Sequence, residues 1–105
     1  MKLRISTDHL RLRVTGEEVN ALSKGETVSV HVKLSAYDEL VCELIPWNLE
    51  LTEAKFTDGK LIINVPASFT SVWPKSKHIA FEQVQQNDSF TPLTILIEMD
   101  MDEMK

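Results

Sequence analysis

The chain is poor in the residues that form cross-links, tight loops and nucleotide-binding turns. It has one cysteine, three glycines and four prolines among 105 residues. The lone Cys42 excludes an internal disulfide, which suits a reducing compartment and indicates the cytoplasm. No glycine-rich loop precedes a predicted helix, so the usual phosphate cradle is not expected.

Long apolar runs are also missing. No stretch approaches the roughly 20 apolar residues of a membrane-spanning helix, and the N-terminus has no apolar segment of signal-peptide length. We therefore expect a cytoplasmic protein with no membrane partner. The length of 105 residues predicts one domain, residues 1–105, which can bury a core without disulfides or metals.

The charge is acidic overall and unevenly placed. The formal net charge is −5, with residues 1–33 summing to +2 and residues 34–105 to −7. Because nucleic-acid phosphates repel an acidic protein, no nucleic-acid partner is expected. Residues 1–33, which are basic overall, are the one part of the chain to which this repulsion does not apply.

Recognisable catalytic and metal-binding patterns are missing too. The three histidines (His9, His31 and His78) are far apart in the sequence and have no metal-ligand spacing. No nucleophile or acid–base pair can be assembled from residue spacing. The sequence therefore predicts no catalytic residue, metal or cofactor, and it disfavours an enzyme without excluding one.

The strongest pattern present is strict alternation of apolar and basic residues at 10–14 (LRLRV). In an extended chain this places the apolar side chains in a core and the arginines on the opposite face. Residues 2–5 alternate in the same way, so residues 2–14 predict a hairpin. Thr15 and Glu18 then form a capping box that begins a helix over 16–24, which Gly25 ends.

Further strands are predicted by alternation and by apolar runs. They lie at about 28–34, 40–45 and 93–99, and another begins with Ile79 and Phe81. A hairpin is predicted over about 49–65, with its turn at Asp58 and Gly59. We expect Pro46 to end a strand, a bulge near residues 52–53, and a loop over 85–89.

A second short helix is predicted over 66–73. Phe69, Val72 and Trp73 have helical spacing, and Pro74 stops the helix. The fold class is therefore α+β, with seven or eight strands and two short helices. Most connections are too short for parallel crossovers, which favours a mostly antiparallel sheet or a flattened barrel with the helices on one side.

Four basic residues share the outward side of the first hairpin and define a cationic face: Lys2, Arg4, Arg11 and Arg13. One interpretation is a patch that binds a small anion. The other, which we favour, is that the chain's own carboxylates neutralise these cations. The last strand carries acids at alternate positions (Glu98, Asp100 and Asp102), so we expect the first hairpin and the last strand to be neighbours in one sheet.

An interaction surface is the other candidate site. Trp47 follows a proline at a strand end, and tryptophan is enriched at interface hot spots. Met99 and Met101 form an apolar edge beside the C-terminal acids, and a terminal strand at a sheet edge is a template for association.

Three stretches resemble a family of small uncharacterised bacterial proteins. They are KLRI at 2–5 with LRLR at 10–13, INVP at 63–66, and LIEMD at 96–100. The resemblance implies no activity, cofactor or catalytic residue, since that family has no assigned function. From the residues, the leading hypothesis is a small protein-interaction domain that self-associates or binds a protein partner. The alternative is a binder of a small anionic ligand through Arg4, Arg11 and Arg13.

Overall fold

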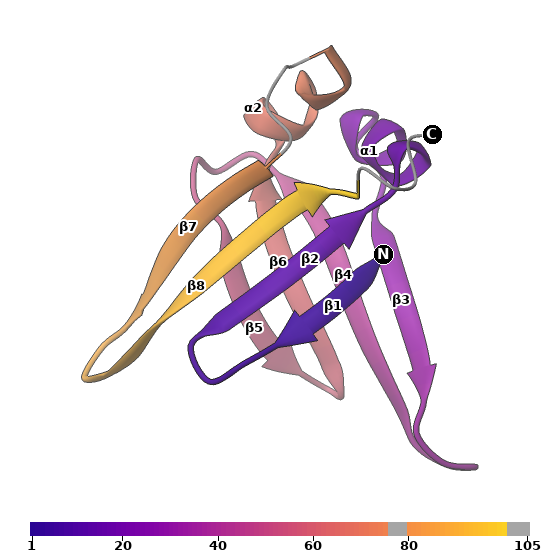
Figure 1. Cartoon of the computed structure of the whole chain (residues 1–105), viewed down its shortest axis with the longest axis vertical. Coiled ribbons are helices and arrows are strands. Elements are labelled where there is room, and N and C mark those ends of the chain that lie inside the picture. The colour runs from indigo at the N-terminus through magenta and orange to yellow at the C-terminus, as the bar shows by residue number, and fades with distance from the viewer. Residues whose placement is uncertain (76–79, 101–105) are drawn as a thin grey trace.

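The computed structural model describes residues 1–75 and 80–100, and in this part of the chain eight strands form two four-stranded sheets (Figure 1). The terminal sheet has the order β1 (Lys2–Ile5), β2 (His9–Val14), β8 (Phe90–Met99) and β7 (Ala80–Asn87). The middle sheet has the order β3 (Val28–Lys33), β4 (Glu39–Trp47), β6 (Lys60–Pro66) and β5 (Glu53–Thr57). The α+β class is confirmed, but the chain forms two separate sheets rather than one sheet or a flattened barrel.

Both sheets have parallel strands at their centres, which the sequence did not predict. β2 runs parallel to β8, and β4 runs parallel to β6, while every other pairing is antiparallel. A direct loop cannot join two parallel neighbours. Here the whole middle of the chain separates β2 from β8, and β5 returns the chain between β4 and β6.

The two halves of the chain have the same order of elements. Each half is a hairpin, a helix and a second hairpin: β1–β2, α1 (Gly16–Ser23) and β3–β4, then β5–β6, α2 (Ala67–Thr70) and β7–β8. Exchanging the halves converts the strand order of one sheet into that of the other. The fold is therefore a topological duplication, although the sequence shows no repeat.

The capping box of α1 is confirmed. The Thr15 hydroxyl accepts a hydrogen bond from the Glu18 amide at 3.1 Å, and the Thr15 amide donates to the Glu18 carboxylate at 2.9 Å. The N-terminal ammonium of Met1 also reaches this carboxylate at 2.9 Å, which ties the start of β1 to the start of α1. Gly25 ends the helix with a φ of 83°, a left-handed conformation that glycine adopts without strain.

The predicted helix over 66–73 is shorter than expected. Pro66 ends β6, α2 covers only Ala67–Thr70, and a 3₁₀ turn, η1 (Trp73–Lys75), includes Pro74. The Val72 amide bonds to the Phe69 carbonyl, so the chain tightens to three-residue spacing before the proline. None of the helices in the described residues is long and apolar enough to cross a lipid bilayer.

Pro46 does not end a strand, contrary to the prediction. β4 continues to Trp47, and Pro46 lies opposite Val65 of β6. β3 begins at Val28, opposite Leu44, so its pairing with β4 does not extend to Pro46. Proline, which has no amide hydrogen, is tolerated where one side of the strand has no ladder to donate to.

Two other strand boundaries also differ from the prediction. Residues 49–51 lie in a loop before β5, so the change of alternation there needs no bulge. β7 continues through Gln85 to Asn87, and only Asp88 and Ser89 turn the chain, so the predicted loop over 85–89 was too long. A register shift does occur, but between Gln85 and Asn87.

The core lies between the two sheets, and the helices lie together at one end of it (Figure 1). Inward side chains of the central strands, such as Leu12, Leu44, Ile63 and Ile97, are fully buried. Burial of each contributes roughly 1.5–3 kcal/mol. Trp73 is also fully buried and packs on Phe69 with ring centroids 4.8 Å apart, so it anchors the helical end to the sheets. The charged side chains of the terminal sheet lie on its outer face, away from this core.

Candidate anion site

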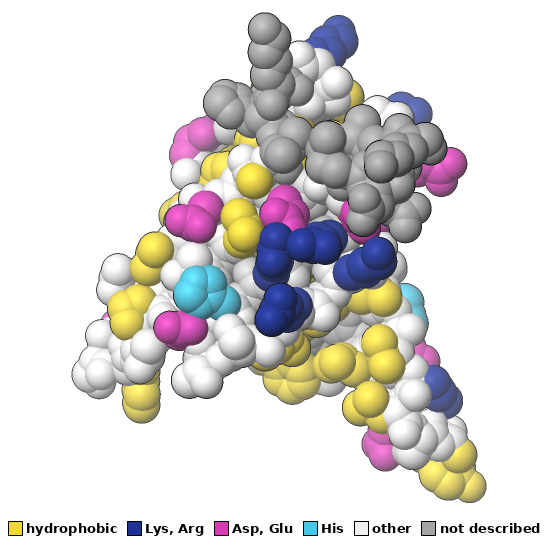
Figure 2. Space-filling model, viewed as in Figure 1, with side chains coloured by type: hydrophobic (Ala, Val, Ile, Leu, Met, Phe, Trp, Pro, Cys, Tyr) yellow, Lys and Arg dark blue, Asp and Glu magenta, His cyan; other side chains and the backbone are white. Residues whose placement is uncertain are grey.

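The cationic face forms as predicted on the outer side of β1 and β2. Register places Lys2 opposite Arg13 and Arg4 opposite Arg11. Like charges directly opposite each other on one sheet face are destabilising, so a nearby negative charge would stabilise each pair. Figure 2 shows the basic side chains gathered in one cluster on this face.

One carboxylate compensates two of the arginines. Glu98 of β8 accepts hydrogen bonds from Arg11 Nε and Arg13 Nε, each at 2.7 Å. Burial of Glu98 disfavours its charge, but the two guanidinium hydrogen bonds outweigh burial and lower the pKa of Glu98. The prediction that the first hairpin and the last strand are neighbours is confirmed, because β8 lies directly beside β2.

A second carboxylate compensates the lysine. Lys2 Nζ lies 3.1 Å from Asp100 Oδ2, and the Asp100 side chain is only 5% exposed. The Asp100 amide donates to the Val14 carbonyl at 2.7 Å, so the two segments remain hydrogen-bonded one residue beyond the end of β8. Asp102, the third predicted acid, lies outside the described residues.

Arg4 differs from the other three cations. No hydrogen bond or ion pair joins it to any other residue in the described part of the chain. β1 is at the sheet edge and lies two strand spacings from β8, about 10 Å, so Glu98 reaches β2 but not β1. Among residues 1–75 and 80–100, Glu98 and Asp100 therefore compensate Lys2, Arg11 and Arg13, whereas Arg4 has no carboxylate partner.

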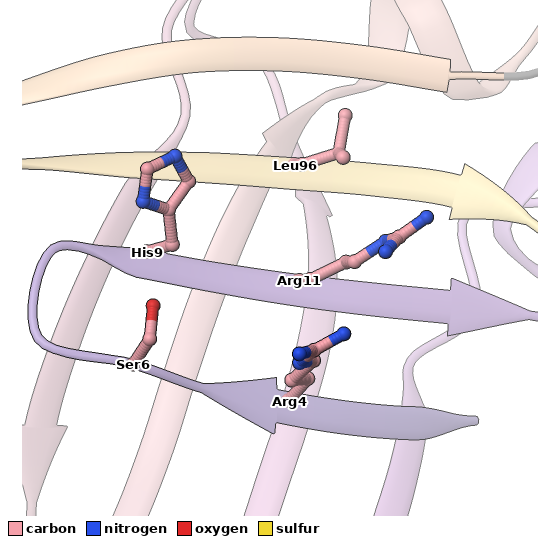
Figure 3. A pocket seen from close by; sticks show the side chains of 5 residues that line it. All are labelled: Arg4, Ser6, His9, Arg11 and Leu96. Atoms are coloured by element: carbon pink, nitrogen blue, oxygen red, sulfur yellow. The ribbon is translucent and has the colours of Figure 1, made fainter.

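Both Arg4 and Arg11 line a hollow of about 260 Å³. Its lining comes from Arg4, Ser6, His9, Arg11 and Leu96 (Figure 3). A second hollow of about 180 Å³ adjoins it and shares Arg4 and Arg11. Figure 3 shows the Arg4 guanidinium over β1 and the Arg11 side chain extending from β2 toward β8, and Leu96 adds an apolar side chain from β8.

Two polar residues of this hollow, Ser6 and His9, were not predicted as site residues. His9 Nδ1 lies 2.7 Å from Asp8 Oδ1, and this hydrogen bond lowers the pKa of Asp8. Because a carboxylate only accepts, Nδ1 is the donor in that contact, and Nε2 of the neutral ring is then an acceptor that does not favour an anion. His9 shares its alternation with Arg11, and that parity was the signal available in the sequence.

Two of the residues predicted as an interaction surface lie on different sheets, Trp47 on β4 and Met99 on β8. Trp47 is half-buried and donates from Nε1 to the Leu51 carbonyl at 2.7 Å. Met99 is half-buried against the core, and β8 lies between β2 and β7. The premise that the last strand is a sheet edge was therefore wrong. Met101 lies outside the described residues.

The remaining chemistry-bearing side chains have local contacts. His31 bonds to Glu39 at 2.6 Å, which lowers the pKa of Glu39. Burial, with a smaller contribution from Glu43, raises the pKa of the Cys42 thiol to about 11. Within residues 1–75 and 80–100, no three metal-ligating side chains form a cluster.

One family model covers the cationic face and the rest of the chain, and it shows to which family the chain belongs. It matches residues 1–105 and describes a family of unknown function, DUF7009. The chain belongs to DUF7009. No curated protein and no solved structure matches this DUF7009 chain, so a proposal about its function must come from its own geometry.

Proposed function

We propose that this protein binds a small anion, the phosphate or carboxylate group of a small molecule, between Arg4 and Arg11. The observation that carries the proposal is the Arg4–Arg11 pair: two arginines are directly opposite each other, and Glu98 bonds only one of them. A bound anion would supply the missing negative charge, because guanidinium groups recognise carboxylate and phosphate through paired hydrogen bonds.

Glu98 also orients the site. Its bond to Arg11 Nε holds that side chain over the sheet and leaves the two terminal nitrogens of the guanidinium for a ligand. Arg4 contributes a second guanidinium from the edge strand. The Ser6 hydroxyl lies on the same hollow and adds a polar contact, while Leu96 accommodates a small organic group attached to the anion.

Ligand-induced stabilisation tests this proposal. Inorganic phosphate is added at constant ionic strength, and the melting temperature is followed with chloride as the reference. A ligand at ten times its Kd adds about 1.4 kcal/mol to stability, and each kcal/mol raises Tm by roughly 4–8 °C in a domain of this size.

Variants R4Q and R11Q should each weaken phosphate binding by roughly tenfold or more, because each removes a charge-assisted contact. R4Q should not lower stability, since it relieves repulsion without breaking an ion pair. K24Q, at an exposed cation on the end of α1, is the control and should bind like the native chain. Equal phosphate shifts in R4Q and the native chain would refute the proposal.

A second candidate function, protein interaction, is favoured by the exposed edge strand β1 rather than by Trp47, Met99 or Met101. β1 has a neighbour on one side only, and Ile5 at its end is 60% exposed. We also propose a cytoplasmic location, which the absence of a disulfide supports and which cell fractionation tests.

A further inference from the structure

The two sheets face each other, and two sides between them are bordered by edge strands. Exchange of the two halves of the chain relates these sides, but different side chains lie along them. One side lies between the edge strands β5 and β7, and the other lies between β1 and β3. On the β5/β7 side, Gln83 accepts from the Thr52 amide at 3.0 Å. Gln85 accepts from the Ala54 amide at 2.6 Å and donates to the Ala54 carbonyl at 3.0 Å. These side chains bridge the two edge strands by hydrogen bonds, although a hollow of about 280 Å³ remains beside them.

The β1/β3 side remains open as an apolar cleft. It has a volume of about 390 Å³, and six of the side chains that line it are Leu3, Ile5, Val30, Val32, Leu40 and Cys42. Ile5 is 60% exposed and Val32 is 44% exposed, although both continue the inward, core-facing rows of their strands. Figure 2 shows hydrophobic side chains directly adjoining the cluster of basic ones.

The free edge of β1 presents backbone groups to this cleft. The Ser6 amide donates to the His9 carbonyl at 3.0 Å, which marks a hydrogen-bonded pair. Hydrogen-bonded and non-hydrogen-bonded pairs alternate along antiparallel strands. Arg4 opposite Arg11 is then a bonded pair, and the amides and carbonyls of Leu3 and Ile5 point away from β2, toward the edge.

We propose that the β1 edge binds an extended segment of a partner protein in which acidic and apolar residues alternate. The segment pairs with the backbone of Leu3 and Ile5 as an additional strand of the terminal sheet. Its apolar side chains enter the β1/β3 cleft, and its acidic side chains lie beside Arg4 on the outer face. Arg4 has no carboxylate partner within the described residues, so this placement supplies one for a charge that this part of the chain leaves unmatched.

A second copy of the chain is disfavoured as the occupant. Antiparallel pairing of β1 with β1 of another copy would place Lys2 and Arg4 of both copies on one face, where like charges repel. Basic residues on an edge strand protect it against self-pairing in this way. The same residues attract a strand that carries carboxylates at the matching positions.

This interaction differs from the small-anion site, although both use Arg4. Arg11 lies one strand inside the edge, so it contacts the anion hollow but not an added strand. Ile5 lines the cleft and not the anion hollow. Variants at Arg11 and Ile5 therefore separate the two proposals.

The test uses the full chain and a capped octapeptide of alternating Glu and Val, followed by fluorescence anisotropy. Its block isomer has the same composition with all Glu residues first, and a third peptide has Lys in place of Glu. The alternating peptide should bind at least about tenfold more tightly than either control, because only it places all acids on one side of a strand. Amide hydrogen exchange at Leu3 and Ile5 should slow when it binds.

The variants I5T and R4Q should each weaken peptide binding several-fold, while R11Q and the matched exposed control V72T should leave it unchanged. Equal binding of the alternating and block peptides, or unchanged exchange at Leu3 and Ile5, would overturn the strand proposal. Concentration-dependent dimers in light scattering that I5T abolishes would identify a second copy as the occupant and would also overturn it. Phosphate binding that is lost in R11Q, without peptide binding, would leave the small-anion function standing alone.

Discussion

Replacing Glu98 by Gln is the sharpest test of how the cationic face is held together. The variant E98Q keeps the size of the side chain but removes the charge that Arg11 and Arg13 share at 2.7 Å. A hydrogen bond to a charged group contributes about 1.5–3 kcal/mol when buried, while an exposed ion pair contributes about 0–1 kcal/mol. Glu98 is 17% exposed and the arginines 35% and 42%. Because both bonds are partly exposed, each should contribute less than a fully buried one. We therefore expect E98Q to lower the free energy of unfolding by about 1–3 kcal/mol in total.

The pH dependence of this loss has a defined sign. The two guanidinium hydrogen bonds outweigh the opposing effect of burial, so the pKa of Glu98 is lower in the folded than in the unfolded chain. The stabilisation is then fully present above the ordinary Glu pKa of about 4.3 and is lost as pH falls through the lower, folded value. The stability difference between E98Q and the native chain should be constant near neutral pH and shrink in acid.

Urea unfolding at a series of pH values measures both effects. The matched control is E43Q, because Glu43 is similarly shielded at 23% exposed but lies 3.7 Å from a single cation, Lys60. The control should cost at most about 1 kcal/mol. If E98Q costs no more than E43Q, or if its cost stays the same in acid, then Glu98 does not hold the cationic face as described.

Three further predictions concern other parts of the fold. Q85L removes two hydrogen bonds to the backbone of Ala54 and should destabilise by about 1–3 kcal/mol in urea unfolding, whereas the exposed neighbour variant Q86L should stay within about 0.5 kcal/mol. T15A removes the N-cap of α1 and should cost about 1 kcal/mol; a native-like unfolding midpoint would contradict the cap. Cys42 is 1% exposed and its thiol pKa is raised to about 11, so mass spectrometry should detect iodoacetamide labelling only when urea unfolds the chain.

Local elements of the fold were predictable because short-range chemistry determines them. The first hairpin follows from alternation, and α1 follows from the capping box of Thr15 and Glu18. The turn at Asp58 and Gly59 also formed as predicted, with φ values of 50° and 76°. Such positive angles at both central residues are typical of the tight Asp-Gly hairpin turn.

The division into two sheets was not predictable from the same signals. Each hairpin has a buried and an exposed face whichever sheet it joins, so alternation alone does not say which hairpins become neighbours. The parallel pairings of β2 with β8 and β4 with β6 depend on contacts between distant segments. The prediction for Pro46 was wrong for a related reason, because a proline is tolerated there only since β3 begins opposite Leu44 and does not pair with Pro46.

The candidate site was predictable in part. Parity placed Arg4, Arg11 and Arg13 on one face and matched the acidic alternation of the last strand to it. The unmatched charge of Arg4 was not visible, because it follows from β1 being two strands away from Glu98. Ser6 and His9 line the same hollow (Figure 3), and the alternation that His9 shares with Arg11 is the one sequence signal that indicated its side of the hairpin.

The central claim is that Arg4 and Arg11 together bind an anion, and the chain's three arginines make a direct measurement practical. The Nε–H resonances of the arginines are followed by NMR while phosphate is added at constant ionic strength. Arg4 and Arg11 should shift together along one saturable curve, and Arg13, which lies outside the hollow, should shift much less. Shifts that do not saturate, or that are equal for all three arginines, would contradict the claim.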